Sequence, residues 1–245
     1  MNLFFCENIE NNRGTFSPEE SAHCIRVLRY RKGDEINVTD GKGSIFTAVV
    51  KTEDNSGCIF EVTGVVESIK KRDYRLHIGI SPVKNMGRFE WFLEKVTEIG
   101  IDVITPVICT RTERPGINSE RMRKILISSV KQALVPVLPV LEEAMDFKNF
   151  VLEIRKRYGD PGTLNSNSLL KLIGYCNEKH RLPLSHLYKA GSDVVFLIGP
   201  EGDFTSDEVT FSMDNGFIAV TLGDTRLRTE TAGIVACTAI SILNS

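Results

Sequence analysis

Two short loops near the C-terminus carry the residue types best suited to building a small-molecule pocket. Residues 199–202 read Gly-Pro-Glu-Gly, and residues 222–232 read Leu-Gly-Asp-Thr-Arg-Leu-Arg-Thr-Glu-Thr-Ala. Each loop follows an apolar, strand-like run, at 194–198 and at 217–222, and each leads into a predicted helix. Such loops present main-chain N–H and C=O groups to a ligand. The sequence therefore predicts a cofactor pocket built mostly from backbone.

The motifs of the common catalytic families are absent from the sequence. It contains no G-x-S-x-G, no Walker A lysine motif and no G-x-G-x-x-G. The histidines lie far apart and suggest no Ser-His-Asp arrangement. Pro200 removes a main-chain donor from the first loop, so this loop is not a usual phosphate cradle.

Composition is that of an ordinary soluble protein, with 245 residues, 42% hydrophobic and 25% charged. The net charge of −2 gives no global sign of nucleic-acid binding, so any basic surface must be local. Two basic segments, 26–32 and 111–131, could form a phosphate-binding face. A solvated helix face explains the same charges equally well.

The six cysteines are scattered and form no C-x-x-C pair. This pattern argues against a zinc site or a disulfide framework, and it favours small buried hydrophobes in a reducing compartment. The N-terminus lacks a signal-peptide pattern, and no apolar run approaches membrane-spanning length. We expect a cytoplasmic protein with no metal and no membrane partner.

The first seventy residues or so read mostly as strands. Strands are predicted at 2–6, 35–39, 44–51 and 58–66. Ser17 to Glu20 form a capping-box pattern with Pro18 at the first helical position, which predicts a short helix to about Leu28. One helix among several short strands suggests a small barrel. Residues 68–73 are charged and resemble a linker.

After the linker, predicted strands alternate with predicted helices, which indicates a largely parallel α/β sheet. The residues at 159–168 read as a loop, and the last helix is apolar enough for a core or a subunit interface. The strands are expected at 74–80, 102–108, 170–176, 194–198 and 217–222, and the helices at 87–99, 118–133, 205–214 and 229–243.

Taken together, the two C-terminal loops and three further segments resemble the RsmE-type family of SPOUT methyltransferases. The resemblance covers nearly the whole chain, and five motifs in the right order are highly specific. The further segments are His23-(x3)-Val27-Leu28-Arg29, Lys84-(x3)-Arg88-x-Glu90-Trp91-(x2)-Glu94-Lys95-x-Thr97-Glu98-Ile99-Gly100, and Ile104-Thr105-Pro106 with Lys131-Gln132.

The resemblance implies a two-domain homodimer. Residues 1–70 would form a PUA-like β-barrel that binds RNA. Residues 74–245 would form an α/β domain of the SPOUT class, with a C-terminal trefoil knot that binds S-adenosylmethionine. The implied reaction is methylation of N3 of a uridine in small-subunit (16S) ribosomal RNA, within the assembled 30S subunit.

The resemblance also implies which loop residues hold the cofactor. For the glycines among them, ordinary tight turns are an alternative role, and capping of the last helix is at least as good an explanation of Thr229. The expected cofactor-binding residues are Ile198, Gly199, Gly202, Leu222, Gly223, Leu227, Arg228, Thr229 and Thr231.

Uridine N3 must lose its proton as the methyl group arrives, and the neighbouring carbonyls then gain negative charge. A cation stabilises that charge, and Arg228 is the expected one because it lies beside the cofactor loop. Glu201 and Glu230 are weaker candidates for accepting the proton or fixing an arginine. Anchoring of loop N–H groups is the simpler explanation of both.

The expected RNA-binding residues come from both predicted domains. His23 could equally lie in the barrel core, and Lys95 could simply pair with Glu94 or Glu98 on its own helix. The set consists of His23, Arg26, Arg29, Arg31, Lys32, Lys84, Lys95 and Arg111.

The chain departs from the family pattern at a few positions near the cofactor loop. Asp203 stands where glycine is commonest, Thr110 replaces a usual glutamate, and Arg226 replaces a frequent aliphatic residue. None of these changes removes a motif glycine or Arg228. Three other functions stay open: methylation of a transfer-RNA ribose 2′-OH, a non-catalytic role in ribosome assembly, and an α/β enzyme that binds nucleotides.

Overall fold

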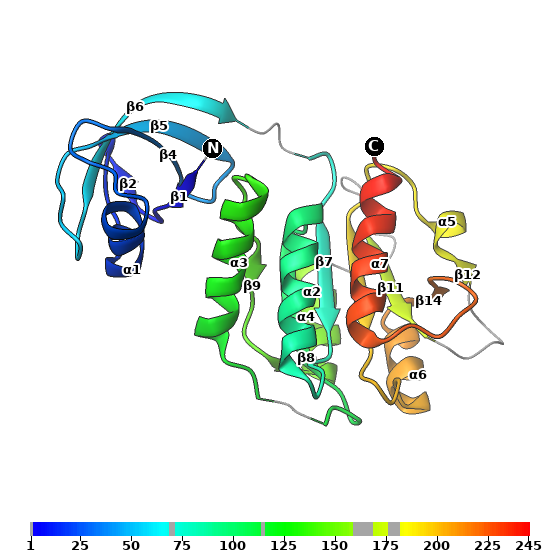
Figure 1. Cartoon of the computed structure of the whole chain (residues 1–245). Helices are drawn as coiled ribbons and strands as arrows, with labels where there is room; N and C mark the ends of the chain where they lie inside the picture. The colour runs from blue at the N-terminus through cyan, green and yellow to red at the C-terminus, as the bar shows by residue number, and fades with distance from the viewer. Residues whose placement is uncertain (1, 69–71, 114–115, 159–168, 176–181) are drawn as a thin grey trace. The chain divides into compact units, whose positions relative to one another are not determined.

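The computed structural model describes residues 2–68, 72–113, 116–158, 169–175 and 182–245, and it divides into two compact units. The first unit comprises Met1–Lys71 and Leu126–Leu138, and the second comprises Arg72–Ile125 and Pro139–Ser245. The N-terminal unit thus takes in a segment that lies far along the sequence. Figure 1 shows the elements of both units.

The first unit is a six-stranded sheet with a short helical segment, and it also includes the C-terminal part of helix α3 (Ser119–Ala133). The sheet order is β1-β4-β5-β6-β3-β2, antiparallel except for the parallel pair β1 and β4. The elements are β1 (Leu3–Phe5), β2 (Ile9–Glu10), β3 (Arg13–Thr15), helix α1 (Pro18–Ala22), π-helical turn η1 (His23–Val27), β4 (Glu35–Thr39), β5 (Ser44–Val50) and β6 (Ile59–Ser68). The expected strands and helix are confirmed, whereas β2 and β3 were not predicted.

The sheet curls around an aromatic core. Register shifts between β5 and β6 fall at Ile45/Phe46 and at Thr47/Ala48, and bulges of this kind bend and twist a strand pair. The buried rings of Phe4, Phe16 and Phe60 stack in the enclosed space, with centroid separations of 5.3 and 4.6 Å.

The start of α1 confirms one half of the predicted capping box. Ser17 Oγ accepts a hydrogen bond from the Glu20 main-chain N–H, with Pro18 at the first helical position. The Glu20 carboxylate is used elsewhere in the unit. It accepts a hydrogen bond from the Phe5 N–H at 3.1 Å and pairs with Lys131 Nζ at 2.7 Å. Residues 126–138 are therefore tied to the sheet by a charge pair.

The second unit is a parallel α/β sandwich. The central strands run in the order β10-β8-β7-β13-β11-β14-β12, with β9 beside β8, and all of these pairs are parallel. The strands are β7 (Leu76–Ile80), β8 (Val103–Ile108), β9 (Val140–Leu141), β10 (Met145–Asp146), β11 (Leu170–Gly174), β12 (Leu182–Pro183), β13 (Val194–Ile198) and β14 (Ile218–Thr221).

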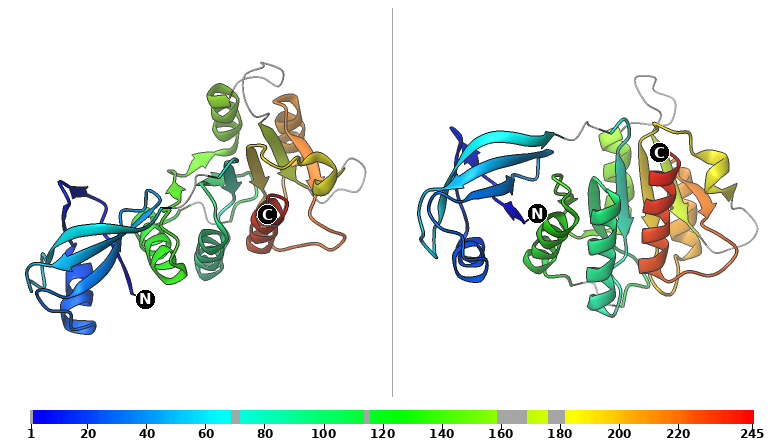
Figure 2. Two further views of the ribbon diagram at one scale, coloured as in Figure 1. Left: turned by 90° about the horizontal axis from the view of Figure 1, so that it is seen from above. Right: turned by 45° about the horizontal axis from the view of Figure 1, so that its top comes forward.

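Helices cover both faces of this sheet, as Figure 2 shows, with α2 and α7 on one face and α4 and α6 on the other. The helices are α2 (Met86–Ile99), α3 (Ser119–Ala133), α4 (Phe147–Tyr158), α5 (Leu184–Leu187), α6 (Ser206–Asp214) and α7 (Thr229–Ile242). The alternating pattern predicted from the sequence is confirmed. Helix α4 was missed, and the loop expected at 159–168 lies outside the described residues.

The helix predicted at 87–99 is confirmed as α2, and one of its faces is an apolar stripe. Phe89, Phe92, Leu93 and Val96 are fully buried. Helix α7 can approach α2 closely because Gly233 faces the Phe92 ring, where a Cβ atom would lie only 2.5 Å from the ring.

The cysteines follow the expected pattern where they are described. Five are free thiols buried in the two units, and Cys176 lies outside the described residues. Burial raises the pKa of the Cys109 thiol, so this group stays protonated. Among the described helices, none has the length and apolar character needed to cross a membrane.

Candidate functional site

The carboxyl ends of three adjacent parallel strands, β11, β13 and β14, open into a cavity of about 260 Å³. Ligands of open α/β sheets commonly bind at this edge, and the volume is near the lower end for small-molecule pockets. The walls come from the ends of those strands, the two loops and the start of α7: Gly174, Tyr175, Ile198, Gly199, Pro200, Glu201, Asp203, Val220, Thr221, Leu222, Gly223, Thr225, Arg226, Leu227, Arg228, Thr229 and Ala232.

Most of the expected cofactor residues lie in this wall, whereas Gly202 and Thr231 do not. Sequence reasoning missed Gly174 and Tyr175, which end β11. A signal for them existed, because the carboxyl ends of neighbouring parallel strands meet at the same edge of a sheet.

Thr229 connects the two loops instead of capping α7. The helix N-cap is Arg228, which makes no side-chain capping bond, and Thr229 is the first helical residue. The Thr229 hydroxyl donates a hydrogen bond to the Gly199 carbonyl oxygen at 2.9 Å. The capping role considered from the sequence is therefore wrong, and the hydroxyl joins the start of α7 to the end of β13.

The 199–205 loop is anchored by one buried carboxylate. Glu208 forms a reciprocal capping box with Thr205 at the start of α6, within the helix predicted at 205–214. Its other oxygen accepts hydrogen bonds from the N–H of Thr110, at 2.8 Å, and from the Thr110 hydroxyl, at 3.0 Å. Thr110 therefore links the loop after β8 to the loop after β13.

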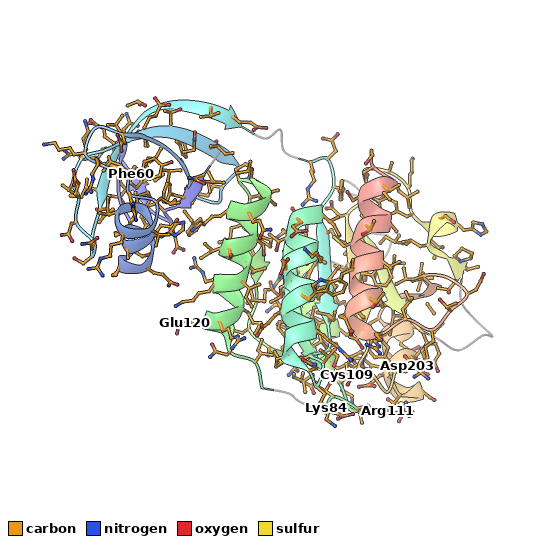
Figure 3. All side chains as sticks on the ribbon, in the orientation of Figure 1. Phe60, Lys84, Cys109, Arg111, Glu120 and Asp203 are labelled. Carbon is orange, nitrogen blue, oxygen red and sulfur yellow. The ribbon has the colours of Figure 1, made fainter. Side chains whose placement is uncertain are left out.

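The middle of the same loop is held by Arg111, which was expected to bind RNA. Its guanidinium donates to the Gly202 carbonyl oxygen at 2.7 Å, and its aliphatic stem packs along Gly202. Figure 3 shows Arg111, Lys84, Cys109 and Asp203 at the same end of the second unit. Arg111 therefore supports the wall of the cavity.

The unusual Asp203 fits its position. Its backbone has φ of 63°, in the left-handed region where glycine is the easiest residue and aspartate is among the better tolerated ones. Its carboxylate accepts a hydrogen bond from the N–H of Phe204 at 2.8 Å. The side chain thus stabilises the turn that it occupies.

The two candidate glutamates do not anchor loop N–H groups, contrary to the simpler sequence expectation. Among the described residues, both carboxylates face Arg88 on α2. Its Nη1 lies 3.8 Å from Glu201 Oε1, and its Nε lies 3.8 Å from Glu230 Oε1. Glu230 is almost fully buried, and its Oε2 atom has no hydrogen-bond partner among the described residues.

Arg228 is exposed and lines the cavity, as does Arg226. Arg226 Nη2 donates to the main-chain oxygen of Glu201 at 3.5 Å. Two positive charges thus lie on the 222–232 side of the cavity, and Arg226 also connects that side to the first loop.

In the first unit, the candidate RNA-binding residues surround η1 and the turn that follows it. Arg26, Arg29, Arg31 and Lys32 are exposed. The guanidinium of Arg31 lies 3.1 Å from the carboxylate of Glu53. His23 is only partly exposed, and its ring lies 6.1 Å from the Phe4 ring in an edge arrangement. The histidine therefore packs against the edge of the aromatic core.

The two lysines expected to bind RNA from the second unit are paired with acids. Lys84 Nζ lies 2.9 Å from Glu113, and hydrogen bonding to that carboxylate raises the lysine pKa. Lys95 contacts both Glu94 and Glu98. Exposed pairs of this kind are weak and exchange readily, so both ammonium groups can still reach a phosphate.

Comparison with known proteins agrees with this arrangement. The family described as "RNA methyltransferase domain" matches residues 70–241, and the one described as "RNA methyltransferase PUA domain" matches residues 16–63. The ribosomal RNA small subunit methyltransferase E of Synechocystis is 28% identical over 235 residues, which cover 94% of this chain and 73% of that protein.

Solved structures extend the similarity over the whole chain. A probable rRNA-methyltransferase from Porphyromonas gingivalis is 39% identical with a TM-score of 0.85, covering 100% of this chain and 98% of that one. The ribosomal RNA small subunit methyltransferase E from Neisseria gonorrhoeae, solved bound to S-adenosyl methionine, is 25% identical with a TM-score of 0.80 and the same coverage. The chain, an α/β domain preceded by a PUA-like domain, therefore belongs to this family of RNA methyltransferases.

Proposed function

We propose that the protein methylates N3 of a uridine in 16S ribosomal RNA, using S-adenosylmethionine as the methyl donor. The observation that carries this proposal is the cavity lined by the two C-terminal loops, which are joined by the hydrogen bond from Thr229 to Gly199. The family membership and the relatives named above agree with this reaction class.

The cavity fits such a donor chemically. Apolar side chains of Ile198, Leu222 and Leu227 suit an adenine ring, while the strand ends leave main-chain groups for its polar edge. Gly223 has φ of 143° and no atom within 4 Å of the place where a Cβ would stand, so its backbone is open to a ligand. When bound, S-adenosylmethionine supplies a methyl group that its positively charged sulfur already activates.

Arg228 is the cation that we assign to the reacting base. Its exposed side chain lies in the cavity wall and makes no ion pair with a described residue. As N3 exchanges its proton for the methyl group, the flanking carbonyls gain negative charge, which a preorganised cation stabilises. As weaker candidates for taking up the proton we assign Glu201, which lines the cavity, and Glu230, which follows Thr229 in the sequence.

The remaining contacts with RNA are divided between the two units. We assign phosphate binding to Arg26, Arg29, Arg31 and Lys32 in the first unit, and to Lys84 and Lys95 in the second. Both sets are side chains that reach solvent. The division between an RNA-binding domain at 1–70 and a methyltransferase domain at 74–245 forms part of the proposal.

We further propose that the enzyme acts in the cytoplasm on the assembled 30S subunit, and that the C-terminal loops form a trefoil knot. We also propose that it works as a homodimer. A dimer is supported by α7, which is apolar around its circumference and leaves Ile242 66% exposed and Leu243 39% exposed. Apolar surface of this kind is stabilised when a second copy covers it.

The deciding experiment is one labelling assay. Unmethylated 30S subunits are incubated with the purified protein and labelled S-adenosylmethionine, and the modified nucleoside is identified by mass spectrometry. We expect label on uridine N3, loss of transfer with Arg228→Ala, and unchanged transfer with Lys156→Ala, which removes an exposed charge from α4 on the opposite face of the sheet.

Calorimetry with S-adenosylmethionine separates binding from chemistry in the same samples. Cofactor binding without any transfer would favour a non-catalytic role in ribosome assembly. Label on a ribose would indicate a 2′-O-methyltransferase. Either result would reject the uridine-N3 assignment.

A further inference from the structure

Arg88, in the first turn of α2, lies between two carboxylates, one from each of the two C-terminal loop regions. Glu201 comes from the loop after β13, and Glu230 comes from the first turn of α7. Glu201 lines the cavity, and Glu230 follows directly after the wall residues Arg228 and Thr229. The guanidinium is therefore held beside the proposed reaction site by both of the loops that build it.

The spacing within this cluster differs from that of the chain's structural ion pairs. Arg72 contacts Asp102 at 2.7 Å and Arg157 contacts Glu142 at 2.7 Å, as expected for charge-assisted hydrogen bonds. Arg88 lies 3.8 Å from each of its carboxylates, which is beyond hydrogen-bond distance. Its side chain is 38% exposed, and the structure gives its N–H donors no hydrogen bond to a described residue.

The charges of the cluster select the kind of group that can use those donors. The formal charges of Arg88, Glu201 and Glu230 sum to −1, so a phosphate placed between the guanidinium and its two carboxylates would be repelled by both of them, whereas Arg226 and Arg228 place positive charge on the 222–232 loop. A neutral base has no such penalty. Its carbonyl oxygen can accept from the guanidinium, while an adjacent N–H can donate to the carboxylate of Glu201, which lines the cavity.

We propose that Arg88 is a catalytic residue that donates a hydrogen bond to a carbonyl oxygen of the target uracil, next to N3. This inference rests on the proposed function and extends it, because uracil has two carbonyls beside N3 and the site offers two arginines, Arg228 and Arg88, from different elements. When N3 loses its proton, negative charge spreads onto both carbonyl oxygens, and this charge is neutralised as N3 takes the methyl group. Donors already held at these oxygens lower the energy of that charge.

The test compares Arg88→Ala and Arg88→Lys with the native protein in two measurements. Calorimetry gives the affinity for S-adenosylmethionine alone, and single-turnover assays on unmethylated 30S subunits give the rate of methyl transfer. We expect both variants to bind the cofactor within about twofold of the native affinity. The transfer rate of Arg88→Ala should fall about 100-fold, as when one preorganised donor to a developing oxyanion is removed, and Arg88→Lys should recover part of it.

Chemical rescue and a charge control sharpen the interpretation. Free guanidinium at millimolar concentration should raise the rate of Arg88→Ala and leave that of the native protein unchanged, since it replaces a missing hydrogen-bond donor. Lys156→Ala should match the native protein in both measurements.

Three results would overturn the proposal. One is native transfer rates with Arg88→Ala. Another is a loss of cofactor affinity as large as the loss of rate, which would make Arg88 a support for the loops. The third is the absence of rescue by either lysine or guanidinium. If the native protein itself transfers no label, the uridine-N3 function fails, and the role of Arg88 fails with it.

Discussion

The hydroxyl of Thr229 donates a hydrogen bond to the carbonyl oxygen of Gly199, at 2.9 Å, and thereby joins the two loops that enclose the cavity. The two residues are far apart in sequence, and Thr229 is nearly fully buried. The first turn of α7 and the end of β13 are thus fixed to each other before a ligand arrives. A ligand that needs both loops then loses less conformational freedom on binding.

Replacing Thr229 with valine should weaken cofactor binding. Valine keeps the shape of the side chain but leaves the Gly199 carbonyl oxygen without its donor, a loss of roughly 1–2 kcal/mol for a buried acceptor. We expect the dissociation constant for S-adenosylmethionine to rise about tenfold in calorimetry. Thr229→Ser keeps the hydroxyl and should stay close to the native value. Equal affinities for the valine and serine variants would contradict this role.

Glu208 is expected to support both the fold and the cavity. Its buried carboxylate accepts hydrogen bonds from Thr205 and Thr110, which belong to different loops. Glu208→Gln turns one oxygen into a donor that faces other donors, which should cost about 1–3 kcal/mol of folding free energy. Thermal unfolding should show a lower Tm and calorimetry a weaker cofactor affinity, whereas Glu143→Gln, at an exposed position, should change neither. An unchanged Tm for Glu208→Gln would refute the assignment.

The sequence predicted the elements that its local patterns encode. The apolar period of α2, the Thr205 capping box and the strands before each loop all follow from residues close together in the chain. It also predicted a pocket formed by the two loops, because each loop follows an apolar run, leads into a predicted helix and can present main-chain groups to a ligand. The strands before the loops, β13 and β14, lie on either side of β11 in the sheet of the second unit.

What the sequence could not predict depends on contacts between distant segments. Arg111 lies in a basic segment and was therefore expected to bind RNA. Its contact with Gly202 depends on the packing of two loops that are distant in sequence. Residues 126–138 join the first unit through Lys131 and Glu20, which no local pattern connects. The missed helix α4, by contrast, could have been predicted from local signals, because Asp146 precedes its apolar face and accepts a hydrogen bond from the Lys148 N–H, and its last turn is basic.

His77, in the central strand β7, should make stability depend on pH. Its ring is 1% exposed, and its Nε2 lies 2.7 Å from the Thr105 hydroxyl, which in turn donates to Glu142. Burial lowers the pKa of His77 to about 4, despite the opposing effect of Glu142. The native state therefore keeps the ring neutral at pH values where the unfolded chain already binds a proton.

The direction of the pH effect follows from this difference. The unfolded histidine titrates near its ordinary pKa of about 6.5. Stability from His77 is therefore complete above that pH and is lost as the pH falls toward 4, by up to about 3 kcal/mol. Urea unfolding at pH 7 and pH 5 should show a smaller loss on acidification for His77→Gln than for the native protein. If both proteins lost the same unfolding free energy between pH 7 and pH 5, His77 would not contribute to the pH dependence.

Gly233 in α7 should tolerate no side chain, even though alanine favours helix formation by about 1 kcal/mol. A Cβ at this position would lie 2.5 Å from the Phe92 ring and 3.1 Å from Ile80, and both side chains are fully buried and cannot move aside. Gly233→Ala should therefore separate α7 from α2 and lower stability by about 1–3 kcal/mol, measured by urea unfolding. Gly64→Ala, where no atom lies within 4 Å of the position of the added Cβ, serves as the control and should stay near the native stability.

Because α7 carries Thr229 and Arg228 at its start, the same shift should also weaken cofactor binding. A Gly233→Ala variant as stable as the native protein would mean that the close contact between α2 and α7 is not required.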